Sequence, residues 1–219
     1  MNALARGKLI TFEGGEGAGK STHAKRLAKF LEGRGLDVTR TREPGGSEGA
    51  EEIRRLLVEG APGRWTPLTE TFLYAAARAD HVARLVEPAL AAGRWVISDR
   101  FTDSTLAYQG YGHGLDAATI ETVNALAAGG LMPDLTVLLD LPVDEGLARA
   151  GKRADDGPLA GREDRYERMD RAFHQRLRDG FRAIAAADTA RCVVIDATRP
   201  VDDVAAAIAA AVTERLLDP

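Results

Sequence analysis

The chain has 219 residues, of which 45% are hydrophobic and 28% charged, a composition ordinary for a globular protein and sufficient for one buried core. The formal net charge is −4, which disfavours a general binder of nucleic acid or of a membrane surface. No apolar run approaches the roughly 20 residues of a membrane span, and the N-terminal apolar stretch is too short for a signal peptide, so we expect a cytoplasmic protein. The single cysteine, Cys192, rules out an intramolecular disulfide and is expected to be buried.

Short apolar runs with the length of β-strands recur along the chain, at 8–13, 37–42, 94–99, 135–140 and 192–196. The first, fourth and fifth are almost continuously apolar and end in an acid, as strands covered on both faces do. Segments with helical character lie between the strands or follow them, at 19–32, 47–59, 68–92, 115–128, 143–153, 162–187 and 200–216. Strands that alternate with helices predict an α/β fold with a five-stranded parallel sheet flanked by helices, in a single domain over residues 1–219.

Residues 14–21, GGEGAGKS, match the pattern G-x-x-x-x-G-K-[ST] in full, between a predicted strand and an amphipathic helix. The glycines bring backbone N–H groups close to phosphate oxygens, the lysine adds a charge for the outer phosphates, and the serine hydroxyl is placed for Mg²⁺. The pattern predicts a P-loop and a three-layer fold of the P-loop NTPase type. Its nucleotide-binding residues are expected to be Gly14, Gly15, Glu16, Gly17, Ala18, Gly19, Lys20, Ser21 and Thr22. His23 is expected to be a solvated surface residue.

A P-loop alone does not choose between a kinase, a GTPase switch and an ATP-driven motor, so a second site must decide. Asp99 and Arg100 follow a predicted buried strand, where a carboxylate can hold Mg²⁺ directly or through water and a guanidinium suits phosphate oxygens. A local salt bridge is the alternative. Tyr74 and Arg78 are four residues apart and share a helix face. Composition alone favours a core tyrosine and a surface arginine there, and Phe72 is expected in the core.

Three further stretches, 42-REPGGSEGAEEIRRLL-57, 72-FLYAAARADHV-82 and 98-SDRFTDSTLAYQGYG-112, together with the P-loop closely resemble bacterial thymidylate kinases. The resemblance runs in order along the chain as far as 195-IDATRP-200. It implies transfer of the γ-phosphoryl group of ATP to dTMP, giving dTDP for dTTP synthesis. It also implies Mg²⁺ as cofactor, ATP and dTMP as small-molecule partners, and a homodimer through helices that flank the sheet.

The same resemblance implies a role for each matched residue of the dTMP site. The family's arginine at the position of Arg100 contacts the acceptor phosphate, the aromatic at Tyr74 stacks on thymine, and the arginine at Arg78 bonds the base O4. The full set implied to bind dTMP is Glu43, Pro44, Tyr74, Arg78, Arg100, Ser104, Thr105, Tyr108 and Gln109. Arg42 is expected to approach the acceptor phosphate, and the adenine of ATP to lie near Ala197–Arg199.

Phosphoryl transfer needs positive charge around the migrating group. Some family members carry the required arginine inside the P-loop, at the position of Gly17, and others supply it from a lid. This P-loop has no arginine, so we expect a lid arginine from about 149–165, although 154–160 departs from compact versions of that lid. The catalytic set is predicted to be Lys20, Arg100, Glu16, Arg153, Arg162 and Arg165. Alternatively, the lid arginines pair with neighbouring acids as a solvated face.

Glu16 is the acid of the loop. The resemblance implies that it bonds the deoxyribose 3′-hydroxyl or orders water on Mg²⁺, so the metal-binding set is Ser21, Asp99 and Glu16, directly or through water. The rival hypotheses are a small P-loop kinase for another acceptor and a GTP-dependent switch. The second is disfavoured because the chain has no guanine-reading N-K-x-D tetrapeptide.

Overall fold

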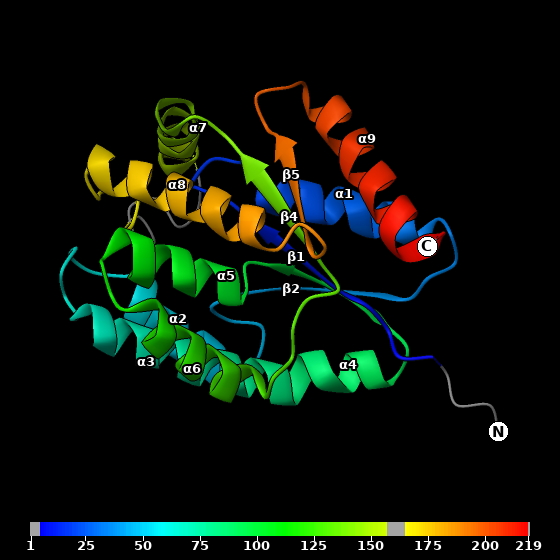
Figure 1. Ribbon diagram of the computed structural model, residues 1–219, viewed down its shortest axis with the longest axis horizontal. Coiled ribbons are helices and arrows are strands. Elements are labelled where there is room, and N and C mark those ends of the chain that lie inside the picture. Colours follow the sequence, from blue (N-terminus) through cyan, green and yellow to red (C-terminus); the bar gives the residue numbers. More distant parts are fainter. Residues whose placement is uncertain (1–4, 157–164, 219) are drawn as a thin grey trace.

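The computed structural model describes residues 5–156 and 165–218. One parallel sheet with the strand order β2-β3-β1-β4-β5 organises them (Figure 1). Its strands are β1 (Leu9–Glu13), β2 (Val38–Arg42), β3 (Trp95–Asp99), β4 (Leu135–Asp140) and β5 (Cys192–Asp196). Each predicted strand is confirmed to within one residue, and with it the five-stranded parallel sheet. Within the described residues, every helix is too short or too polar to cross a membrane.

Helices cover both faces of the sheet. On one face, α1 (Lys20–Glu32) and α9 (Val201–Val212) pack on side chains of the central strands, including Ile10 and Val137. The opposite face carries two further apolar clusters, one under α8 (Arg171–Ala187) and one around α4 (Glu87–Ala91). The remaining helices are α2 (Glu48–Val58), α3 (Pro67–His81), α5 (Thr102–Thr105), α6 (Ala117–Ala128) and α7 (Val143–Asp156).

The helices depart from the predicted ranges mainly at three places, and α9 in addition ends in a π-helical turn at Thr213–Leu217. The segment predicted as helical over 68–92 contains a π-helical turn at Val82–Val86 between α3 and α4, next to Pro88, which has no N–H for the regular helical bond. A second π-helical turn at Leu106–Gly112 continues α5, and neither was predicted, because this stretch has no helical period of apolar residues. The helix predicted over 162–187 begins only at Arg171, where Asp170 accepts a hydrogen bond from the N–H of Phe173.

Two predictions of exposure are wrong. His23 was expected at the surface, but only 4% of it is exposed, because its ring packs against the turn at Gly19. Phe72 was expected in the core, but it is 55% exposed, because α3 turns Glu70, Arg78 and His81 inward instead. The fifth strand is also less covered than predicted. It is an edge strand of the sheet, buried at Cys192 as expected and open to solvent at its middle.

The P-loop packs backbone to backbone against the first turn of α7. A Cβ atom added at Gly17 would lie 2.0 Å from the carbonyl oxygen of Gly146, and one added at Gly146 would lie 2.5 Å from the carbonyl oxygen of Glu16. The φ angle of Gly17 is also positive, at 71°. Two independent constraints therefore favour glycine at position 17, the positive φ of its backbone and the close approach of α7.

We expect the substitution Gly17→Ala to lower the free energy of unfolding by about 1–3 kcal/mol, because the new methyl group strains φ and displaces α7. Gly15→Ala is the matched control in the same loop, since a Cβ atom there meets nothing within 4 Å. Urea unfolding of both variants measures the difference. Equal stabilities of the two variants would contradict the proposed packing constraint.

Candidate active site

The functional motifs meet at the carboxyl edge of the sheet because β1, β3 and β2 are neighbours. Phe12 of β1 lies opposite Asp99 of β3. The N–H of Arg100 donates to the carbonyl oxygen of Phe12 at 2.9 Å, and the N–H of Glu43 donates to that of Asp99 at 2.9 Å. Three stretches that are far apart in sequence therefore open into one site.

The P-loop is already shaped to surround phosphate. Gly14, Gly17 and Gly19 have positive φ angles, and α1 begins at Lys20. The Lys20 ammonium donates to the carbonyl oxygens of Gly14 at 3.0 Å and Gly15 at 2.8 Å. The pKa of Lys20 is lowered to about 8, chiefly by burial and then by the charge of Arg100, while the attraction of Glu16 opposes both. A polyphosphate would supply the negative charge that this buried cation lacks.

Ser21 and Asp99 provide the oxygen ligands expected of a Mg²⁺ site. The Ser21 hydroxyl donates to Oδ2 of Asp99 at 2.5 Å. Both residues line one hollow with Glu16, the third predicted metal ligand. Among the described residues no group of three or more histidine, cysteine or acidic side chains could hold a metal alone. The donors therefore fit a magnesium ion whose coordination is completed by substrate phosphates and water.

Arg100 joins the P-loop to the second site. Its guanidinium donates to Oε1 of Glu16 at 2.9 Å, to the carbonyl oxygen of Gly14 at 3.1 Å and to the Ser104 hydroxyl at 3.1 Å. It also lies over the ring of Tyr108, 5.0 Å from its centre. Arg100 is the one residue other than glycine with a positive φ in the described chain, at 73°. Such a conformation costs roughly 1–3 kcal/mol and is typical of functional sites.

Glu16 keeps its negative charge inside this cluster. Burial acts to raise its pKa, but the charges of Arg100 and Lys20 outweigh burial and lower the pKa to about 2. The Tyr108 hydroxyl donates to Oε1 of Glu16 at 2.5 Å and stabilises the ionised form further. The loop acid is thus held as a carboxylate between two cations, where it limits their mutual repulsion.

A cleft next to the P-loop collects the residues implied to bind the acceptor. Its lining contains all nine predicted residues, Glu43, Pro44, Tyr74, Arg78, Arg100, Ser104, Thr105, Tyr108 and Gln109. The hollow at the P-loop shares four of the residues that line the cleft, namely Glu16, Glu43, Arg54 and Arg100. Two ligands could therefore meet across this shared wall, one held by the P-loop and one in the cleft.

Arg78 is 2% exposed and lines the cleft. It donates to Glu43 at 2.8 Å and to Asn124 at 2.6 Å. It donates also to the carbonyl oxygen of Phe101 at 3.1 Å and to Thr105 at 3.0 Å. Among the described residues these contacts use four of its five N–H groups, so one remains for a ligand. Arg78 is therefore a buried, fixed donor, and the alternative of a surface charge is wrong.

Tyr74 and Tyr108 form part of an aromatic wall of the cleft. The Tyr74 hydroxyl donates to that of Tyr166 at 3.1 Å. The rings of Tyr108 and Tyr166 meet edge to face, with centres 5.1 Å apart. Their planar faces and hydroxyl groups suit a ligand that carries both an aromatic base and a sugar.

Five lining residues escaped the sequence analysis, Arg54, Val58, Phe101, Tyr166 and Glu167. Arg54 donates to the carbonyl oxygen of Pro44 at 2.8 Å and lines both hollows. It lies within the stretch 42–57 that carries the resemblance, so its position in a motif was the available signal. Tyr166 directly follows the predicted lid at 149–165, where only arginines were assigned a role, so it was not expected to line the cleft.

The predicted arginines outside the cleft have different surroundings. Arg165 is buried, with its guanidinium donating to Glu70 and to the carbonyl oxygens of Leu57 and Ala61. Arg162 lies outside the described residues, and so does the side chain of Arg153. Arg42 is half exposed and bonds Glu51 at 3.0 Å. In the predicted adenine loop, the carbonyl oxygen of Ala197 accepts from Arg149 at 3.1 Å.

Comparisons with known proteins identify the family of this chain. A family model described as thymidylate kinase matches residues 12–208. The thymidylate kinase of Rhizorhabdus wittichii is 52% identical over 210 residues, covering 96% of this chain and 99% of that protein. That of Caulobacter vibrioides is 51% identical over 213 residues, covering 97% and 99%.

A solved structure leads to the same family. The crystal structure of thymidylate kinase from Ehrlichia chaffeensis has a TM-score of 0.73 and 32% sequence identity to this chain. It covers 94% of this chain, and 99% of its own length is matched. The chain therefore belongs to the thymidylate kinase family, whose members are kinases that phosphorylate dTMP with ATP.

Proposed function

We propose that this chain transfers the γ-phosphoryl group of ATP to dTMP at the wall shared by the P-loop hollow and the cleft. The observation that carries the proposal is the position of Arg100 and Glu16, which line both hollows. ATP occupies the P-loop side, with Lys20 on its outer phosphates. The phosphate of dTMP lies beside Arg100, and its base extends toward Tyr74, Arg78 and Gln109.

Residues of the cleft are proposed to contact both the thymine base and the deoxyribose. The free N–H of Arg78 bonds the O4 carbonyl of thymine, and Tyr74 stacks on the ring. Tyr108 lies under the deoxyribose, which places its ring where a 2′-hydroxyl group would need space. Ser104 and Thr105 complete this wall. These roles would favour a pyrimidine deoxynucleotide with a carbonyl group at C4.

Catalysis then rests on position and charge. The attacking phosphate oxygen is already anionic at neutral pH, so the reaction needs no strong general base. Mg²⁺, held by Ser21 and Asp99 when bound, neutralises charge on the phosphates of ATP. Arg100 and Lys20 hold the two phosphate groups in line. Glu16 reduces the repulsion between these two cations. It also accepts a hydrogen bond from the acceptor sugar or from metal-bound water.

A coupled assay of ADP release over dTMP, dUMP, dCMP, dGMP and AMP measures the acceptor preference. We expect dTMP to have the highest kcat/KM, because only thymine offers the O4 acceptor together with the methyl group of this family's substrate. A better acceptor among the other four would overturn the assignment. Slow hydrolysis that no acceptor accelerates would indicate a nucleotide-dependent switch.

The transition-state arginine is proposed to be Arg153 or Arg162. The contact between Gly17 and Gly146 leaves no space for an arginine at position 17 of the P-loop, which supports a lid origin. The third candidate, Arg165, is committed to Glu70 and two backbone carbonyls, which favours a supporting role for it.

We expect Arg153→Ala or Arg162→Ala to lower kcat by about 100-fold or more, the magnitude typical of a lost arginine finger. Arg165→Ala should instead lower the free energy of unfolding by about 3–5 kcal/mol, because it leaves the Glu70 carboxylate buried without its cation. Steady-state kinetics and thermal unfolding separate the two effects. Normal turnover in both Arg153 and Arg162 variants would contradict a lid arginine.

The proposed assembly is a homodimer through α3 and α6. These helices pack on each other and expose apolar side chains together, with Leu68 42%, Phe72 55% and Leu126 79% exposed. Exposed apolar residues clustered on neighbouring helices are typical of protein interfaces.

Sedimentation velocity tests this assembly. Phe72→Glu should convert the dimer to a monomer, because it buries a charge at the centre of the proposed interface. Val201→Glu is the matched control, since Val201 is 49% exposed on α9, on the other face of the sheet. A wild-type chain that sediments as a monomer at micromolar concentration would contradict the proposal.

A further inference from the structure

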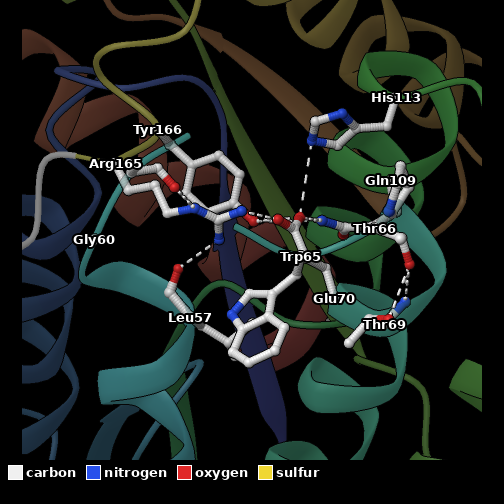
Figure 2. Close-up of polar contacts among 12 residues, drawn as sticks. Leu57, Gly60, Trp65, Thr66, Thr69, Glu70, Gln109, His113, Arg165 and Tyr166 are labelled. Atoms are coloured by element: carbon white, nitrogen blue, oxygen red, sulfur yellow. Dashed lines mark hydrogen bonds and ion pairs between the residues drawn. The ribbon is translucent and has the colours of Figure 1, made fainter. Parts of the chain in front are cut away.

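Glu70 is a buried acid outside the roles assigned so far. It lies on α3, is 1% exposed, and forms the centre of a polar cluster next to the cleft (Figure 2). One carboxylate oxygen accepts from Arg165. The other accepts from the Tyr166 hydroxyl at 2.9 Å and from Nε2 of Gln109 at 3.2 Å. Glu70 thus connects the segment before α8 to a residue of the proposed base site.

The contact with Glu70 decides how the Gln109 amide is oriented. A carboxylate that is paired with an arginine only accepts hydrogen bonds, so the NH₂ group of Gln109 must face it. The carbonyl oxygen Oε1 then points away from Glu70. That oxygen is buried and has no hydrogen-bond partner among the described residues.

A buried acceptor without a partner indicates a missing donor. Leaving it unsatisfied costs about 1–3 kcal/mol, and Gln109 lines the cleft. The N3–H group of thymine is a donor next to the O4 carbonyl that Arg78 is proposed to bind. A cytosine ring has an acceptor at N3 and would face the Gln109 oxygen with repulsion.

Arg165 and Tyr166 keep Glu70 in place. Arg165 is held on its other sides by the carbonyl oxygens of Leu57 at 2.9 Å and Ala61 at 3.2 Å. Tyr166 is fixed by Tyr74, whose hydroxyl donates to it at 3.1 Å. Arg165 therefore holds one carboxylate oxygen, and Tyr166 holds the other, which also accepts from Gln109. His113 Nε2 lies 3.8 Å from the carboxylate and forms no hydrogen bond with it.

We propose that Glu70 is a positioning residue for base recognition: it fixes the Gln109 amide so that its oxygen accepts from the N3–H of the acceptor base. The inference rests on the proposed function, because it needs thymine in this cleft. Glu70 touches neither substrate itself. Its contribution is to specificity, through the direction of one amide group.

The test compares dTMP with N3-methyl-dTMP, which lacks the donor, for the wild type and Glu70→Gln. The neutral amide that Glu70→Gln introduces can donate a hydrogen bond as well as accept one. The Gln109 amide can therefore rotate and exchange the positions of its oxygen and NH₂ group. We expect Kd and KM for dTMP to rise about tenfold, the value of one buried hydrogen bond. The preference for dTMP over N3-methyl-dTMP, measured from calorimetric Kd values, should fall by a similar factor, with KM for ATP unchanged.

Two further variants make the result decisive. Glu87→Gln removes an exposed acid paired with Arg6 and should leave the preference unchanged. Glu70→Asp keeps the charge opposite Arg165 but withdraws the carboxylate from Gln109. It should reduce the preference about threefold or more even if Glu70→Gln does not fold.

A merely structural role for Glu70 predicts a different pattern. The affinities for dTMP and for N3-methyl-dTMP would then fall equally as the protein loses stability. The preference for dTMP over N3-methyl-dTMP would stay at the wild-type value. That result in the Glu70 variants overturns the inference. Failure of the proposed function is separate, because it would appear in the wild type as poor turnover of dTMP.

Discussion

The contact between Arg100 and Glu16 is the interaction on which the site depends. It spans from the end of β3 to the P-loop beside β1, and it lines both ligand hollows. Lys20 is buried close by, so without the carboxylate two cations would repel each other where little solvent screens them. The positive φ of Arg100 is retained at some cost in energy, because it aims the guanidinium at this point. Substrate phosphates would add the negative charge that the cluster still lacks.

Sequence patterns predicted the strands of the sheet and the P-loop well, and the reasons are physical. Buried parallel strands must be apolar and short, and the P-loop needs glycine at fixed positions, so both leave local signals. The polar walls of the cleft leave none. Thr102–Gly112 is mostly buried without an apolar period, and Tyr166 reaches the cleft only through tertiary packing. The resemblance located much of the cleft, whereas the contacts that hold it together required the structure.

Helix α3 shows why the exposure of Phe72 and Arg78 was predicted wrongly. A helix usually turns its aromatic side chains inward and its charges outward. Here Glu70, Arg78 and His81 are buried, and Phe72 faces outward. Burying three polar groups is costly unless each has partners, and the pairs with Arg165, Glu43 and Thr41 provide them. The buried face of this helix is therefore specified by polar pairs with its neighbours as well as by apolar packing.

The close approach of Gly17 and Gly146 also limits how such an enzyme can change. The atom that would meet a side chain at position 17 is a backbone carbonyl oxygen, so no substitution at position 146 can remove it. If the catalytic arginine comes from the lid, as proposed, moving it to position 17 would require the displacement of α7 as well as the replacements themselves. The two catalytic designs would then be separate solutions, divided by a change of backbone rather than by a gradual series of point mutations.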